Sequence, residues 1–208
     1  MRILGVLPRN AAGLVKGLAL LSLLLLGGCG VNDIPTYQEQ AKAAWSEVLN
    51  QYQRRFDLVP NLVETVKGYA AQERETLTAV TEARAKVGQT QLPANVVTDK
   101  NAFETFQRNQ AALTSALSRL LVVVERYPDL KSNQNFLALQ SQLEGTENRI
   151  AVARRDYIQA VARYNTELRT IPGRWWAALL YPDAQVMQTF TIEAEAQKAP
   201  KVDFGTKK

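Results

Sequence analysis

The sequence predicts an all-α protein, an antiparallel bundle of three or four long helices followed by an irregular C-terminal tail. Apolar residues recur at steps of three and four along three long stretches, which is typical of amphipathic helices that share a core. Glycine and proline fall at a few boundaries between these stretches and are not scattered as in a many-stranded β protein. Connections of moderate length between the stretches favour antiparallel neighbours.

Residues 1–28 have the organisation of an export signal. The first sixteen residues include three basic side chains and no acidic one, residues 18–26 are apolar except for Ser22, and two glycines close the segment. A basic start, a short apolar run and small residues before a cleavage site define a signal peptide. The apolar run is shorter than the ~20 residues of a spanning helix, so an uncleaved membrane anchor is the weaker alternative.

Cys29 is the only cysteine of the chain, and it directly follows Leu26-Gly27-Gly28. This tetrapeptide resembles a bacterial lipobox. The resemblance implies that Cys29 is linked to diacylglycerol, becomes the N-terminus after cleavage and is then acylated on its amine, which would anchor the protein stably. The alternative is an ordinary signal peptide followed by a free cysteine. We therefore predict a lipoprotein signal peptide at 1–28 and a lipidated linker at 29–35.

The bundle domain is predicted to span residues 36–172, and its first helix to run from Thr36 towards a stop at Gly88. Thr36 and Glu39 have the spacing of a capping box. Pro60 lacks an N–H and crowds the preceding turn, so this helix should be bent or broken near Pro60. The predicted apolar stripe consists of Tyr37, Ala41, Trp45, Val48, Tyr52, Phe56, Val59, Leu62, Val66 and Tyr69.

Two further helices complete the predicted bundle. The second begins near Thr98 or Asp99 and ends before Tyr127-Pro128, and the third begins at a Ser132 cap and ends at Pro172-Gly173. An unbroken first helix would be ~75 Å long and would outreach the second. The third helix and the tail could cover the excess, or it could project as a stalk or pair with another molecule.

The C-terminal tail, residues 173–208, has no sustained period, but it contains an apolar stretch from Trp175 to Tyr181. One interpretation is that this stretch plugs the end of the bundle. The other is an interfacial membrane contact, because tryptophan and tyrosine favour that zone. Arg174 suits either role. Residues 202–205 could dock as a short extended piece.

Composition excludes several function classes. Removal of residues 1–28 takes away three basic residues, so the net charge of +5 falls to +2, which is no nucleic-acid footprint. The chain contains no histidine, and its one cysteine is predicted to carry lipid. Metal sites and thiol or histidine catalysis therefore lack their usual residues, and we expect no cofactor and no enzymatic activity.

Two long segments resemble the LemA family: "RRFDLVPNLVETVKGYAAQERETL" at 54–77 and "YPDLKSNQNFLALQSQLEGTENRIAVARRDYIQAVARYN" at 127–165. The tail "APKVDFG" at 199–205 is similar to proteobacterial members. The resemblance implies a mainly helical antiparallel bundle that is held at a membrane by its N-terminus, with its body outside the cytoplasm and no known enzymatic activity. Many members have an uncleaved N-terminal spanning helix, and this chain departs from them in having a lipobox.

A cluster of polar residues interrupts the apolar stripes. Glu147 lies on the seam of the third helix between Leu143 and Ile150. A polar group there often fixes helix register, so the first interpretation is that Glu147 pairs with an arginine. The second is a recognition or ion site at the proline bend. The candidate residues are Arg54, Arg55, Asp57, Asn61, Glu147 and Arg154.

The function predicted from these observations is that of a membrane-anchored lipoprotein, a non-enzymatic helical scaffold or protein-interaction module in the cell envelope. Its expected partners are the membrane, through the lipid on Cys29, and an envelope protein. The alternative is an accessory subunit or adaptor of a membrane protease or transport assembly. Gly30 is not the aspartate that retains lipoproteins at the inner membrane, which favours the periplasmic face of the outer membrane in a diderm cell.

Overall fold

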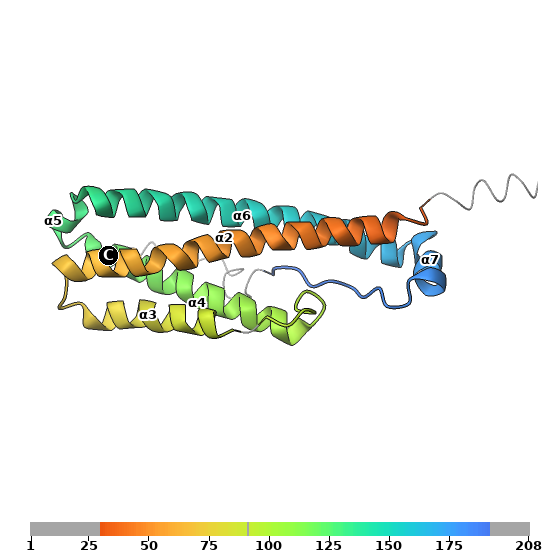
Figure 1. Cartoon of the computed structure of the whole chain (residues 1–208), viewed down its shortest axis with the longest axis horizontal. Helices are drawn as coiled ribbons and strands as arrows, with labels where there is room; N and C mark the ends of the chain where they lie inside the picture. The colour runs from red at the N-terminus through yellow and green to blue at the C-terminus, as the bar shows by residue number, and fades with distance from the viewer. Residues whose placement is uncertain (1–29, 91, 192–208) are drawn as a thin grey trace, which may run out of the picture.

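The computed structural model describes residues 30–90 and 92–191, and within these ranges the chain forms helices and no strands (Figure 1). Four long helices run antiparallel to one another in chain order, which confirms the predicted all-α bundle. A short helix and a terminal helix lie at opposite ends of it. The elements are α2 (Asp33–Tyr69), α3 (Arg74–Gln89), α4 (Lys100–Val124), α5 (Pro128–Lys131), α6 (Gln134–Arg169) and α7 (Gly173–Leu180).

Helix α2 begins earlier than predicted and continues through Pro60. The residue before the helix is Asn32, and Thr36 lies inside the helix, so the capping box predicted at Thr36 is wrong. The predicted linker 29–35 accordingly loses its last three residues to the helix. Pro60 cannot donate to the carbonyl of Phe56, which accepts instead from Arg84 Nε at 3.2 Å. This side-chain donor from α3 satisfies the carbonyl that Pro60 leaves free, and of the two predicted outcomes, a bend or a break, the break is absent.

The chain turns between Tyr69 and Arg74, where the sequence pattern predicts a continuous helix. Glu73 fixes this turn, because its carboxylate accepts from Tyr127 Oη at 2.7 Å and from Arg126 Nη2 at 3.1 Å. The turn lets α3 fold back and bury Leu77 and Val80 against α2 and α4. The excess length predicted for the first helix is therefore a separate helix.

The remaining helix ends have identifiable caps. The Asp99 carboxylate accepts from the N–H groups of Asn101 and Ala102, which confirms the predicted start of α4. Asn133, and not the predicted Ser132, caps α6 by accepting from the N–H of Phe136 at 3.0 Å. Ser132 instead ends α5, a short helix that begins at Pro128.

The bundle contains two apolar cores in series along its axis. In the first, beside α7, aromatic rings of α2, α4 and α6 pack together, with Trp45 lying 5.2 Å from Phe106 and 5.2 Å from Tyr157 between ring centroids. The second, at the α5 end, is built from side chains of all four long helices and α5, and these are aliphatic except for Phe136. Its fully buried members include Val59, Leu62, Val66, Val80, Leu113, Leu120 and Leu130.

Residues 181–191 form an extended segment that packs into the first core. Phe190 lies 5.1 Å from Phe103 and 5.7 Å from Tyr157 between ring centroids. Main-chain groups of Met187 exchange two hydrogen bonds with the side chain of Asn165, and Tyr157 Oη donates to the carbonyl of Gln188 at 2.8 Å. The predicted tail thus contains a helix, α7, and an irregular segment that is part of the core. Residues 202–205 lie outside the described ranges.

Helix α7 contacts the end of the bundle, as expected for one of the two roles considered for the stretch from Trp175 to Tyr181. Trp176 and Ala177 pack against the first core, as expected of a plug. Trp175 and Leu179 face away from it and are exposed. Within the described ranges, no helix is both long enough and apolar enough to cross a bilayer.

Replacement of Phe190 by alanine should destabilise the whole bundle, because its ring is 8% exposed and contacts three other rings. We expect the free energy of unfolding in urea to fall by about 3–5 kcal/mol, the usual cost of removing a buried Phe side chain. Val186→Ala, at a more exposed position of the same segment, is the matched control and should cost little. Equal stability of Phe190→Ala and the parent would show that the segment is not part of the folded core.

Candidate functional site

The candidate site is a polar layer centred on Arg55, between the two apolar cores. Arg55 occupies a stripe position of α2 between Tyr52 and Val59, and its side chain is 1% exposed. Gln110 is the polar residue in the buried stripe of α4, and Thr146 is the polar residue in that of α6. Glu147, next to Thr146, faces Arg55. A cation buried this deeply requires charge-assisted hydrogen bonds, because it has lost its water.

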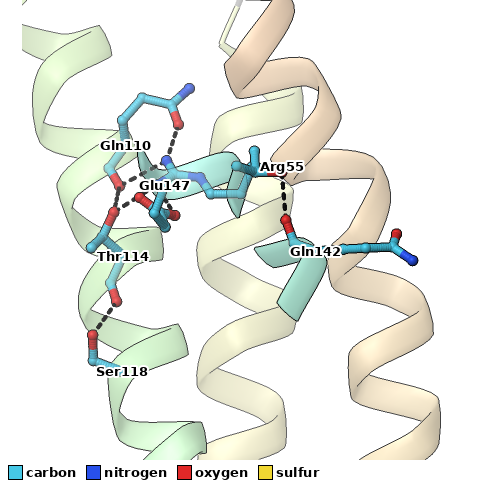
Figure 2. A network of polar contacts seen from close by, with 7 residues as sticks. Arg55, Gln110, Thr114, Ser118, Gln142 and Glu147 are labelled. Atoms are coloured by element: carbon cyan, nitrogen blue, oxygen red, sulfur yellow. Dashed lines mark hydrogen bonds and ion pairs between the residues drawn. The ribbon is translucent and has the colours of Figure 1, made fainter. Parts of the chain in front are cut away.

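The guanidinium of Arg55 connects three helices (Figure 2). Its Nη1 donates to Thr114 Oγ1 at 2.7 Å and to Glu147 Oε1 at 2.9 Å. Its Nη2 donates to Gln110 Oε1 at 2.6 Å and to the Gln110 carbonyl at 3.3 Å. The layer therefore ties α2 to α4 through a side-chain amide and to α6 through an ion pair.

Hydroxyl groups extend the layer along α4 and α6. Thr114 Oγ1 donates to the Gln110 carbonyl at 3.1 Å, and Ser118 Oγ donates to the Thr114 carbonyl at 3.0 Å. On α6, Thr146 is fully buried and its hydroxyl donates to the Gln142 carbonyl at 2.7 Å. These hydroxyls are satisfied within their own helices, so they add polarity to the layer without adding charge.

A cleft of about 370 Å³ opens beside the layer, and Arg55, Glu147 and Arg154 contribute to its walls. Glu147 is the more accessible partner of the ion pair, with 36% of its side chain exposed. The Arg154 guanidinium lies 4.3 Å from the centroid of the Phe190 ring, in a cation–π contact. Burial raises the pKa of Tyr52 above 10.0, although the charges of Arg154 and Arg55 oppose this in part.

The structure brings together only some of the six predicted site residues. Arg55 and Glu147 pair directly, and Arg154 lines the same cleft. Arg54, Asp57 and Asn61 lie on the exposed side of α2 and do not join the layer. The Asp57 carboxylate accepts instead from Gln53 Nε2 at 2.8 Å.

Cys29, the predicted lipidation site, lies outside the described residues. Its lipid attachment therefore stays a prediction.

Sequence reasoning missed Gln110 and Thr114, which supply two of the partners of Arg55. The available signal was the gap in the second stripe, where Gln110 stands between Phe106 and Leu113 at the spacing of an apolar residue. A polar residue at such a position of one helix calls for a polar partner on its neighbours. Phe56 was placed on the core stripe, but it packs against the Arg84 guanidinium, 3.9 Å from its ring centroid.

The described residues offer little for acid–base or metal chemistry. No group of three or more Asp, Glu, His or Cys side chains is arranged to hold a metal ion in the ranges 30–90 and 92–191. The carboxylate that reaches the cleft, that of Glu147, is already paired with Arg55. The polar layer is therefore suited to aligning the helices. Solvent reaches it at Glu147 and Arg154, which line the cleft.

These features define an elongated antiparallel helical bundle with a buried arginine layer at its middle. The sequence matches the LemA family over residues 44–204, and the chain belongs to this family. The resemblance seen in its two long segments is thereby confirmed.

Three curated relatives illustrate how divergent the family is. The chain is 26% identical to magnetosome protein MamQ 2 of Paramagnetospirillum magneticum, in an alignment that covers 85% of this chain and 71% of the relative. It is 23% identical to protein LemA of Metamycoplasma hominis, with 84% and 73% covered. It is 26% identical to magnetosome protein MamQ of Magnetospirillum gryphiswaldense, with 71% and 60% covered.

Substitutions at Arg55 and Glu147 should reveal how strongly the layer holds the helices together. Glu147→Ala removes the carboxylate facing a buried guanidinium, and we expect it to lower the free energy of unfolding by about 1–3 kcal/mol. Glu147→Leu alone should give no rescue, because Arg55 stays buried without its countercharge. The double variant Arg55→Met/Glu147→Leu should be more stable than either single variant, since it removes both charges together.

Urea unfolding of the parent, Arg55→Met, Glu147→Leu and the double variant gives the coupling energy between the two positions. Glu144→Ala is a matched control, because Glu144 lies on the same helix with its side chain exposed. Additive effects of the two single substitutions would contradict the proposed dependence of Arg55 on Glu147.

Proposed function

We propose that this LemA-family protein is held at a membrane of the cell envelope by a lipid on Cys29 and acts there as a non-enzymatic helical scaffold or protein-interaction module. The observation that carries the proposal is the place of the described N-terminus. Gly30 lies at one end of the bundle, and α2 begins three residues later at Asp33. A lipid on Cys29 would therefore hold the bundle by this end with almost no intervening linker.

The shape of the bundle supports a scaffold. Helix α2 has 37 residues, and at 1.5 Å per residue it extends for ~55 Å. A rod of this length that is held by one end would present its long sides to other envelope proteins. Retention of such a protein at the periplasmic face of the outer membrane would follow, in a diderm cell, from glycine in place of aspartate at position 30.

The chemistry of the polar layer supports a role without catalysis. The two terminal nitrogens of Arg55 donate to groups of α4 and α6, and Glu147 serves as the ion-pair partner of that arginine. The sequence contains no histidine to act as a general base near neutral pH. The names of the relatives give a family and a magnetosome association, and none of them states a reaction.

Replacement of Cys29 by alanine should abolish lipid attachment and leave a larger, unprocessed precursor, because the thiol that accepts diacylglycerol is lost. Metabolic labelling with a palmitate analogue, followed by gel analysis, measures both effects. Ser22→Ala, within the same leading segment, is the control and should be labelled like the parent. Label retained in Cys29→Ala at the level of the parent would overturn the lipid anchor.

The interaction role predicts that envelope proteins co-purify with the parent after crosslinking and extraction in mild detergent. Quantitative mass spectrometry of the eluate separates the two versions of the proposal. A single partner in fixed ratio would support an adaptor of a protease or transport assembly, whereas several partners in varying amounts would support a scaffold. Recovery of the protein alone, from membranes in which it is abundant, would count against both.

A further inference from the structure

Exposed apolar side chains are concentrated at the end of the bundle where α2 begins. Of the eleven large apolar side chains that are exposed in the described ranges, five lie between residues 171 and 186. Leu179 is 73% exposed and Trp175 is 62% exposed, so most of the surface of both side chains is not covered by the described part of the chain. The five are Ile171, Trp175, Leu179, Leu180 and Val186. We call the first four the α7 patch, since they lie on or next to that helix.

The α7 patch is held in a fixed orientation. Trp176 and Ala177, on the opposite side of α7, pack against the first core. Gly173 sits so close to the end of α6 that a Cβ there would clash with the Glu167 carbonyl oxygen. Because one side of α7 is fastened to the bundle, the other side presents Trp175 and Leu179 outwards as a constant feature of the fold.

The α7 patch lies beside Gly30, the residue that follows Cys29 in the chain. A Cβ on Gly30 would be 3.8 Å from Cγ of Pro172, the residue before α7. Figure 1 shows α7 and the start of α2 at the same end of the bundle, with α5 at the other. A lipid anchor on Cys29 would thus bring the patch next to the bilayer surface.

We propose that the α7 patch is a second membrane contact, in which Trp175 and Leu179 enter the interfacial layer of the bilayer that holds Cys29. This inference rests on the proposed anchor. Tryptophan favours the depth of the lipid headgroups, where its ring is apolar and its N–H meets water. Exposed Arg169 and Arg174 flank the patch and can reach headgroup phosphates while their stems lie along apolar surface, and exposed Asp183 balances part of their charge.

The lipid on Cys29 explains why an apolar patch as small as the α7 patch would stay in contact with the bilayer. A lipidated Cys29 makes insertion of α7 an intramolecular step, for which the effective concentration of bilayer is high. Two attachments at one end would also restrict tilting, so that the long axis of the bundle points away from the membrane. The other end, with α5, would then stand far from the lipid.

Quenching of tryptophan fluorescence by brominated lipid tests this contact in the full-length protein. The chain contains three tryptophans, of which Trp45 is buried in the first core and Trp176 is half-buried. The protein, purified from its own membranes, is reconstituted into phosphatidylethanolamine–phosphatidylglycerol vesicles with or without brominated acyl chains. We expect bromine to quench the parent and to lose most of this effect in Trp175→Phe. Leu179→Glu should weaken the quenching while the bundle stays folded.

The matched control moves the indole to the opposite end of the bundle. Val122 lies two residues before the end of α4, near α5, and is 71% exposed. In Trp175→Phe/Val122→Trp, the new tryptophan should escape quenching. Equal quenching at the two positions would show that the bundle lies flat on the bilayer and would overturn the end-on contact.

Flotation of the same vesicles separates failure of the contact from failure of the anchor. Protein that floats with the vesicles while Trp175 remains unquenched would refute the α7 contact and leave the anchor standing. Protein that does not float would refute the anchor on which the inference rests. Protection of Trp175 within a dimer that persists in detergent would assign the patch to a second copy of the chain and overturn the proposal.

Discussion

The buried guanidinium of Arg55 is the constraint to which the rest of the bundle conforms. A cation that is 1% exposed has lost its hydration, and it is tolerated only where hydrogen-bonding and charged partners replace water. Gln110 and Glu147 supply them from α4 and α6. A shift of either helix by one turn would move its partner away from Arg55 and place an apolar side chain against the charge. We infer that the layer acts as a register device for three helices, the best-attested use of buried polar groups.

Helices α2, α4 and α6 contribute to both apolar cores, but the segment that packs beside them differs on the two sides of the polar layer. On one side of the layer, α3 covers the second core. Gly88, near the end of α3, packs against Phe56, which follows Arg55 in α2. On the other side, the extended segment 181–191 covers the first core, and the carbonyl of Thr191 accepts from Gln107 Nε2 beside the layer. Two unrelated pieces of chain thus close the same bundle in succession, and Thr191 of the second piece contributes to the wall of the cleft near Arg55.

This construction gives the molecule two different ends. The α5 end is closed by turns that are pinned to each other through Glu73 and Tyr127. The α7 end holds the described N-terminus and the α7 patch. An asymmetric rod of this kind suits attachment to a surface at one end and recognition along its sides. The low identity to MamQ and LemA relatives fits a fold whose apolar stripes tolerate substitution, because volume and pattern matter more than the identity of each residue.

The sequence by itself determined the fold class, most of the apolar stripes, the start of α4 and a polar interruption of the α6 stripe at Glu147, although Thr146 holds the buried position there. Each of these depends on local periodicity or on a cap within a few residues, and local signals can be read without knowing the partners. Only the tertiary structure decided where the first predicted helix divides. Residues 70–73 contain good helix formers, and they turn because burial of Leu77 and Val80 outweighs local propensity. The same holds for Pro60, where Arg84 of another helix supplies the missing donor, and for Arg55, whose partners lie 55 and 92 residues away. The choice of partner across such separations is set by packing of whole helices, so it becomes visible only once they are assembled.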